Sequence, residues 1–440
     1  MNEIRRFRFA RLLPAVSMVF VMVLSGCGDD IFDVKNPGAI LDEDLNTARG
    51  VDALVVGMSS DFSVSYDGQS FLNARGGPEM TGGGSYYLTG EVRRGLTISE
   101  DIDGFWEGAQ RARWVAEAGL ERMKTLGDYT FENNPLTARA YLFAGLANRW
   151  LGENFCYVVF SAPYETDTGE ALGKDVAFTR AVGHYNLAIQ NGSGDVVTAA
   201  HGGLAQAYIN LGEFSQAATH AAMVPTDYVF NASYSLNSGR EENEMVIETH
   251  QRAEMSVFGT FIAELGPDGD PRAPWKDCST PGTCASGHQG AGDSNNLNYQ
   301  QMKYPDYGAD IPLVKGTEMR LFEAEIALRN NDLDGAMAKI NEVRAFHGLD
   351  PLTATGIGTI TFEWDSMTGW DILDREYLLT TWLEGRHLGR FHRWDQEGMT
   401  HPYLTGKNHL YELVVPKRFT CYPIADSECQ VNPEVSGLCI

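Results

Sequence analysis

The sequence predicts a mainly α-helical protein, in which tetratricopeptide-like helix pairs form a scaffold that carries long irregular ligand-binding loops and a few short strands. Apolar residues recur at helical spacing in several stretches, and this is the main evidence for the class. Two of these stretches have the form of a helix, a short turn and a second helix. Two long segments, at about 66–100 and 224–316, are instead rich in Gly and polar residues.

Three helices are predicted in the first half of the chain, at 103–126, 136–151 and 175–190. All three show apolar residues at helical spacing. In the first of them, one helical face collects Phe105, Ala109, Ala112, Ala116 and Leu120. Each helix is therefore expected to present an apolar face to a shared core.

Two helix pairs are predicted at 196–223 and 318–347. In the first pair, Gly212 stops a helix rich in small residues, and a second helix begins at Ser215. In the second pair, the dipeptide 331–332, Asn-Asp, marks the turn. The pattern of Ala, Leu and Gly in both pairs resembles tetratricopeptide repeats, which stack to form one continuous core.

The two long segments are predicted to be loops with a function. Loops of this length are uncommon in compact domains and tend to carry binding residues. Residues 244–250, EMVIETH, are the strand predicted within the second segment. No linker separates the helical stretches, so residues 27–440 are predicted to form a single domain.

The N-terminus has the features of an export signal. Arginines precede a short apolar run at 12–24, and the residues Leu-Ser-Gly-Cys at 24–27 resemble a bacterial lipobox. This resemblance implies that residues 1–26 are a lipoprotein signal peptide and that Cys27 carries lipid. The acyl chains would anchor the protein to a membrane. The acidic residues Asp29 and Asp30 resemble the tether of lipoproteins sent to the outer membrane or cell surface.

Composition and motifs exclude several classes of function. The chain has 440 residues, of which 43% are hydrophobic, and its net charge of −25 makes nucleic acid an unsuitable partner, since phosphate binding needs a basic surface. The nucleophile-elbow, HExxH and P-loop motifs are absent, and no cofactor or metal site is predicted. His184, His201 and His220 lie near the predicted helix pairs and are expected to be ordinary core or surface histidines.

Six cysteines remain once Cys27 is assigned to lipid, and an even number in an exported chain indicates disulfides. Cys278 and Cys284 frame a short Pro/Gly loop and are predicted to pair. Cys421 and Cys429 are close in the sequence and are also predicted to pair. Cys156 and Cys439 are then left for each other, although sequence does not establish connectivity.

Several segments, in order along the chain, resemble motifs of the SusD/RagB family of outer-membrane nutrient-uptake lipoproteins. They are ARAYLFAGLANRWLGENF at 138–155, NEMVIETH at 243–250, DPR at 270–272, the second helix pair within 310–349, DREYLLTTWLEGRHLGRFHRW at 374–394 (a helix in the family) and YPIADSECQVNP at 422–433. The resemblance implies a lipid-anchored, surface-exposed protein of the outer membrane. Such a protein caps a SusC/RagA-like TonB-dependent transporter and delivers an oligosaccharide or another oligomeric nutrient to it.

Aromatic side chains on loops are the candidate ligand-binding residues, because flat rings stack on sugar rings with little loss of side-chain entropy. Tyr86 and Tyr87 lie in the first loop segment, and Trp275, Tyr299, Tyr304 and Tyr307 lie in the second. The family's loops do not align residue by residue, so no binding residue is carried over from the resemblance.

Two other functions compete with nutrient binding. A tetratricopeptide-like lipoprotein that scaffolds envelope proteins would present a regular helical face with short loops, whereas this chain has long ones. An enzyme is not predicted. Glu376 and Glu384 suggest a glycosidase pair, yet the resemblance makes them scaffold charges.

Overall fold

The computed structural model describes residues 42–82, 92, 95–160, 169–284, 290–291, 296–405 and 418–440. The chain divides into a larger unit, residues 46–440, which is compact, and a smaller one, residues 1–45. Of the smaller unit, residues 42–45 are described, and they lie in a 3-10 helix, Asp42–Asn46. The predicted signal peptide and Cys27 lie outside the described residues.

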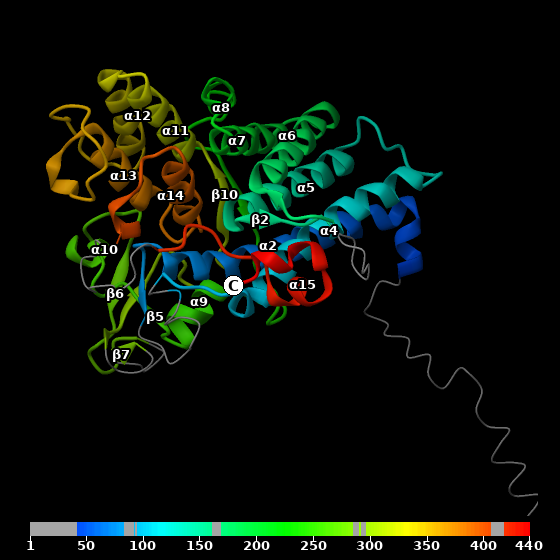
Figure 1. Cartoon of the computed structure of the whole chain (residues 1–440), viewed down its shortest axis with the longest axis horizontal. Coiled ribbons are helices and arrows are strands. Elements are labelled where there is room, and N and C mark those ends of the chain that lie inside the picture. The colour runs from blue at the N-terminus through cyan, green and yellow to red at the C-terminus, as the bar shows by residue number, and fades with distance from the viewer. Residues whose placement is uncertain are drawn as a thin grey trace, which may run out of the picture. The chain divides into compact units, whose positions relative to one another are not determined.

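Helices dominate the larger unit, and the mainly α fold class is confirmed (Figure 1). The predicted helices of the first half correspond to α4 (Asp103–Thr125), α5 (Pro135–Asn154), α6 (Lys174–Asn191), α7 (Asp195–Asn210) and α8 (Phe214–Ala221). The second predicted pair corresponds to α11 (Gly316–Arg329) and α12 (Leu333–Phe346). Their boundaries agree closely with the prediction because apolar periodicity and turn residues are local signals.

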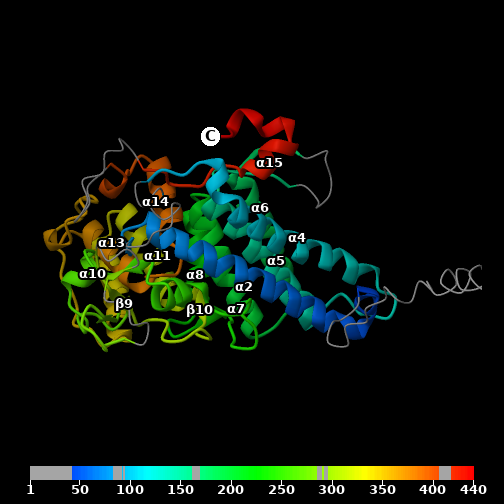
Figure 2. The ribbon, with the colours of Figure 1, turned by 90° about the horizontal axis from the view of Figure 1, so that it is seen from below.

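Successive helices pack against one another. Helix α5 packs against α6, α6 against α7, and α7 against α8. Helix α4 packs against both α5 and α2 (Val51–Gly76), and Figure 2 shows α2 and α4 side by side. The Tyr185 ring of α6 is fully buried at positions where Gly145 of α5 and Gly203 of α7 leave room for it. Small residues thus allow the close approach of these three helices.

Helix α2 corrects the predicted boundary of the first loop segment, since residues 66–76 are helical. The helix escapes apolar pattern analysis because much of its buried surface is polar, including Ser63, Asp67, Gln69, Ser70 and Asn73. Asp67 and Asn73 find hydrogen-bond partners on distant segments of the fold. For example, Asn73 Nδ2 donates to Asn154 Oδ1 at 2.7 Å and to the Gly385 carbonyl at 2.9 Å.

The strand predicted at 244–250 is wrong. This segment forms a short α-helix, α9 (Glu244–Val246), followed by a π-helix, Ile247–Gln251. The side chain of Asn243 caps the first turn by accepting a hydrogen bond from the Met245 amide at 2.9 Å. The apolar and β-branched residues of 244–250 favour a strand, but this preference is weak and depends on context. In this segment the capped helical turn prevails over it.

The family-like motif at 374–394 is also not one continuous helix. It contains the end of α13 (Gly369–Thr380), a turn, and α14 (His387–Gln396). The backbone φ angles are 58° at Leu383 and 66° at Gly385, which helical geometry does not allow. A Cβ atom at Gly385 would lie 2.6 Å from the Ser70 hydroxyl and 2.8 Å from the Trp150 ring, so the turn is packed tightly against α2 and α5.

The described strands are short and form two-stranded pairs. They are β1 (Thr81–Gly82) with β5 (Met255–Ser256), β2 (Tyr157–Val158) with β3 (Leu172–Gly173), β4 (Val229–Ala232) with β10 (Ile311–Lys315), β6 (Trp275–Asp277) with β9 (Tyr299–Gln301), and β7 (Gly290–Ala291) with β8 (Asn296–Leu297), all antiparallel. The remaining described helices are α10 (Phe261–Glu264) and α15 (Asp426–Val431), and several 3-10 turns. None of the helices in the described ranges is both long and apolar enough to cross a membrane.

All six predicted cysteines form disulfides. Cys278 pairs with Cys284, as the short loop predicts. The other predicted pairs are wrong, because Cys156 bonds to Cys421 and Cys429 bonds to Cys439. The cause is a long-range contact: an isolated parallel bridge between Phe155 and Tyr422 places Cys156 beside Cys421.

Candidate functional site

The ribbon of β6 and β9 is the candidate binding site, and it lies in the second predicted loop segment. Its register places Trp275 opposite Gln301, Lys276 opposite Gln300, and Asp277 opposite Tyr299. Side chains alternate between the two faces of a strand. Trp275, Asp277 and Tyr299 therefore share one face, and Lys276 points to the other.

Two aromatic rings stack on the first face. The rings of Trp275 and Tyr299 have centroids 4.4 Å apart and an interplanar angle of 17°. They are diagonal neighbours across the strand pair, which is a favourable arrangement for aromatic side chains. The Phe258 ring meets Tyr299 edge-on, with centroids 5.3 Å apart. Trp275 is only 8% exposed, whereas Tyr299 and Phe258 are half-buried, so Tyr299 and Phe258 form the accessible part.

Hydrogen bonds hold this platform rigid. The Trp275 Nε1 donates to the Ile262 carbonyl of α10 at 3.2 Å. The Tyr299 amide donates to Ser256 Oγ at 2.9 Å, and the Tyr299 carbonyl accepts from the Val257 amide at 2.8 Å. Thus β5, β9 and α10 together position the rings before any ligand arrives.

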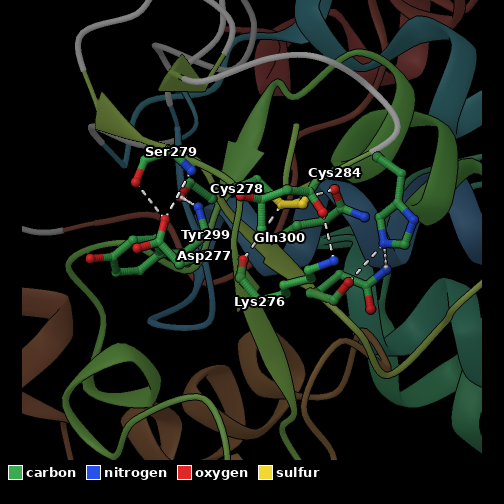
Figure 3. Close-up of a disulfide and its surroundings, with 11 residues drawn as sticks. Lys276, Asp277, Cys278, Ser279, Cys284, Tyr299 and Gln300 are labelled. Carbon is green, nitrogen blue, oxygen red and sulfur yellow. Dashed lines mark hydrogen bonds between the residues drawn. A yellow bond between two sulfur atoms is a disulfide. The ribbon is translucent and has the colours of Figure 1, made fainter. Parts of the chain in front are cut away.

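A carboxylate lies beside the platform. Asp277 is exposed, directly across from Tyr299, and its Oδ1 accepts a hydrogen bond from the Ser279 amide at 2.9 Å as well as one from the Ser279 hydroxyl (Figure 3). Burial, and then the Asp277 carboxylate, raise the pKa of the Tyr299 hydroxyl, which stays protonated at neutral pH. The site thus combines a flat aromatic surface with a hydroxyl group and a carboxylate.

The loop 278–284 closes the end of the ribbon (Figure 3). The disulfide joins its two ends, and Lys276 Nζ donates to the Thr283 carbonyl at 2.6 Å. The Cys278 amide donates to the Asn298 carbonyl at 2.8 Å, which continues the pairing of the two strands. The lysine charge is therefore held on the loop, away from the aromatic face.

The π-helix contacts the same ribbon at the end of β9. His250 Nε2 donates to the Gln301 carbonyl at 2.7 Å. Burial lowers the pKa of His250, so its ring is neutral near pH 7. π-helical turns often occur at functional sites, and this one anchors the end of β9.

The predicted binding residues do not all meet at this site. Trp275 and Tyr299 come together. Tyr304 is a core residue instead, since it is 2% exposed and its hydroxyl donates to the Leu383 carbonyl at 3.1 Å. Tyr307 is half-buried and packs against the core. Tyr86 and Tyr87 lie outside the described residues.

Sequence reasoning missed Phe258 and Asp277. The alternation in Trp-Lys-Asp at 275–277 could have placed Asp277 on the same face as Trp275, had this segment been identified as a strand. Phe258 carried no such signal, because its position beside Tyr299 depends on β5 and β9 lying next to each other.

Other predicted features take structural roles. Arg272 and Arg344 each lie 2.6 Å from the fully buried carboxylate of Glu376. Glu384 is bound by Lys303 and Lys315 at 2.6 and 2.7 Å. His184 lies 3.3 Å from Glu117, while His201 and His220 contact each other through their Nδ1 atoms at 2.9 Å. The described residues contain no group of three or more side chains suited to holding a metal ion.

A second concave region lies away from the ribbon. It is a groove of about 610 Å³ lined by Lys124, Phe131, Glu132, Asn133, Tyr141, Leu187, Gln190 and Asn191. Its rings are less suited to stacking, because Tyr141 is only 6% exposed and meets Phe131 edge-on. This groove is a competing site that a variant can test.

Comparison with known proteins finds the same architecture in solved structures. No family model matches the sequence, and neither does any curated protein. Solved structures match the fold over most of both chains. A laminarin-binding SusD-like protein is 16% identical with a TM-score of 0.64, over 88% of this chain and 98% of that one. Surface glycan-binding protein A from Bacteroides uniformis is 13% identical with a TM-score of 0.65, over 88% and 98%.

A SusD/RagB family protein from Bacteroides thetaiotaomicron is 14% identical with a TM-score of 0.62, over 89% of this chain and 95% of that one. At such low identities, the agreement concerns the fold. The resemblance predicted from the ordered sequence motifs is confirmed at that level: this chain has the fold of the SusD/RagB proteins.

Proposed function

We propose that this protein binds a glycan at the β6–β9 ribbon and passes it to an outer-membrane transporter. The observation that carries the proposal is the stacked pair of Trp275 and Tyr299 beside Asp277. The fold supports it, since solved structures of this fold include proteins named as binding laminarin and surface glycans.

The chemistry of the platform suits a sugar. The C–H face of a pyranose ring packs on an aromatic ring, and the sugar hydroxyls donate to a carboxylate or exchange hydrogen bonds with a phenol. Because the Tyr299 ring is already stacked on Trp275 and its backbone is hydrogen-bonded, little side-chain entropy is lost when a ligand binds.

We propose binding without catalysis. Glycoside hydrolysis needs two carboxyl groups that flank the scissile bond with suitable pKa values. Glu376 and Glu384 are buried and held by basic side chains, so neither is available for this role. Asp277 would serve as a hydrogen-bond acceptor.

The first test measures binding of soluble glycans, with laminarin, a xylan and a mannan as probes, by isothermal titration calorimetry. Tyr299→Ala should weaken the affinity of the wild-type ligand about 10- to 30-fold, which corresponds to the loss of roughly 1.5–2 kcal/mol of aromatic contact. The matched control is Tyr157→Ala, which removes a tyrosine that is 39% exposed on β2.

The competing groove supplies the opposing outcome. If Phe131→Ala abolishes binding and Tyr299→Ala leaves it unchanged, the ligand occupies the groove at α4 and α6 and our assignment of the ribbon is wrong. If the wild-type protein binds none of the probes, glycan binding itself is in doubt.

We further propose that lipid on Cys27 anchors the protein at the surface of the outer membrane, where it caps a SusC/RagA-like TonB-dependent transporter. The basis is the lipobox-like sequence and the family resemblance. Affinity purification of the tagged, membrane-extracted protein should recover a TonB-dependent transporter in near-equal amount. Recovery of envelope assembly factors alone would favour the tetratricopeptide-like scaffold instead.

A further inference from the structure

The disulfide-closed loop 278–284 lies next to the proposed binding face, and its contacts reach both sides of the ribbon. Ser279 donates twice to the Asp277 carboxylate, and the Thr283 carbonyl accepts from Lys276. The disulfide between Cys278 and Cys284 fixes the distance between these two contacts. The side chains of Asp277 and Lys276, one on each face of the ribbon, are therefore both bound to one small covalent ring.

We infer that the Cys278–Cys284 disulfide is a positioning device, which holds the Asp277 carboxylate beside Tyr299 so that it accepts hydroxyl groups of an uncharged glycan. The inference rests on the proposed function and deepens it, because it names the class of glycan and the residues that select it. Cys278 and Cys284 act through Asp277 and need not touch the ligand.

Geometry favours Asp277 as an acceptor. Both bonds from Ser279 go to Oδ1. A carboxylate offers about four acceptor positions, so Oδ2 keeps its capacity for a ligand hydroxyl. A hydrogen bond to a charged acceptor is stronger than one to a neutral acceptor. A carboxylate that is already fixed also loses less conformational entropy when a ligand hydroxyl binds to it.

Charge favours an uncharged ligand. Asp277 lies on the aromatic face, whereas the neighbouring Lys276 lies on the other face and is bound to the loop. The whole chain also carries a net charge of −25. A uronate or sulfate placed on the Tyr299 ring would face a carboxylate of like sign at short range, which costs affinity.

Cys278 is buried, but the middle of the loop contributes little to the core, which makes the role of the loop largely separable from folding. Thr280, Pro281 and Gly282 are exposed or at a turn, and the disulfide spans a sequence separation of only 6 residues. A short closed loop restricts the unfolded chain less than a long one. Opening it should therefore lower the melting temperature by only about a few degrees while it releases Asp277.

The test is a double-mutant cycle on the full chain, with laminarin, a xylan and a mannan as neutral probes. The variants are Cys278→Ser with Cys284→Ser, Asp277→Ala alone, and all three changes together. We expect the disulfide variant and the Asp277 variant each to lose about ten-fold in affinity. The combined variant should lose no more than the larger single effect, because both act through one carboxylate.

The matched control removes another short disulfide, with Cys429→Ser and Cys439→Ser, whose separation is 10 residues. It should leave affinity unchanged. Additive effects, or full affinity in the Cys278/Cys284 variant, would overturn the inference. Since Asp277→Ala does not alter the disulfide, its result stands even if the cysteine variant folds poorly.

Polygalacturonate serves as the anionic probe. The wild-type protein should bind it at least ten-fold more weakly than its best neutral glycan, and Asp277→Asn should narrow this difference. Tighter binding of polygalacturonate by the wild-type protein would refute the selection of uncharged ligands. Failure to bind any glycan would instead refute the proposed function on which this inference depends.

Discussion

Single buried acids control part of this protein's response to pH. Asp67 on α2 is 4% exposed, and its two oxygens accept hydrogen bonds from the amides of Gly68 and Glu244 at 2.7 and 2.8 Å. Burial raises its pKa to about 8, and the neighbouring Glu244 adds to the increase. Burial, and then Glu244, likewise raise the pKa of Glu248 to about 7.

These shifts have a definite sign. Above pH 4 the unfolded chain has released the Asp67 proton, whereas the folded chain keeps it until about pH 8. The folded state therefore binds more protons over this range, and the free energy of unfolding falls as the pH rises. Glu325 acts in the opposite direction: Arg393 and Arg329 hold its pKa below the usual range despite burial, so its contribution is lost as the pH falls below about 4.

The first stability prediction concerns Asp67→Asn. Between pH 5 and 7.5 the wild-type free energy of unfolding should fall, with a contribution from Asp67 of up to about 1.4 kcal/mol per pH unit. The Asn variant should lack that contribution and show a flatter profile in urea unfolding. Asp52→Asn, at an exposed position of α2, is the control and should keep the wild-type slope. Equal slopes in all three proteins would mean that Asp67 is ionised in the folded state.

At the scale of helices, contact between α5, α6 and α7 depends on residues that lack a side chain. A Cβ atom at Gly203 would lie 2.3 Å from the Tyr185 ring, and one at Gly145 would lie 2.6 Å from it. Both glycines are placed within helices, where alanine has the higher helix propensity. Packing therefore opposes propensity at these two positions.

Gly203→Ala should lower the free energy of unfolding by about 1–3 kcal/mol through overpacking, in spite of a propensity gain of about 1 kcal/mol. Gly183→Ala is the matched control, since it lies in α6 with no atom within 4 Å of the added Cβ, and it should stabilise by up to about 1 kcal/mol. Thermal unfolding of both variants measures the contrast. A stabilised Gly203→Ala variant would show that the helices can move apart at no cost.

Sequence patterns succeeded for elements whose signals are local. Helices α4 to α8 and the pair α11–α12 lie close to their predicted bounds because apolar spacing, caps and turn residues act within a few residues. The sequence patterns failed to predict helix α2 and the helical conformation of residues 244–250. In α2 many of the buried side chains are polar, and one of them, Asn73, bonds to the distant Asn154, so no clean apolar stripe marks the helix.

At the scale of the whole molecule, the disulfide Cys156–Cys421 connects the most distant parts of the described chain, with a sequence separation of 265 residues. It joins the end of α5 to the C-terminal segment, beside backbone hydrogen bonds from the Cys156 amide to Tyr422 at 2.9 Å and from the Tyr422 amide to Asn154 at 2.7 Å. The C-terminal motif that resembles the family's own is thereby tied to the helical scaffold.

Removal of this link by Cys156→Ser and Cys421→Ser should reduce the free energy of unfolding about twice as much as removal of Cys429–Cys439. In the chain-entropy model, the loss grows with the logarithm of the closed loop, and the sequence separations are 265 and 10 residues. Guanidinium unfolding of the two double variants tests the ratio. An equal loss from both would indicate that local packing, not loop closure, dominates.

The candidate site shows how far sequence reasoning reached. Loop position and ring chemistry selected Trp275 and Tyr299, which the structure stacks on one face. The same reasoning also selected Tyr304, which lies in the core, since composition does not distinguish a ring that faces solvent from one that packs beneath the loop. Asp277 was overlooked because its position beside Tyr299 depends on the register of β6 with β9.

By itself the sequence determined the helical class, the positions of most helices, the SusD-like order of motifs and the Cys278–Cys284 pair, because these depend on interactions between residues near one another in the chain. The tertiary structure alone decided the polar helix α2, the partners of Cys156 and Cys429, the burial of Tyr304, and the face that Tyr299 shares with Asp277. Each of these is set by contacts between distant segments, whose free energy depends on which surfaces meet and leaves no local periodic pattern in the sequence.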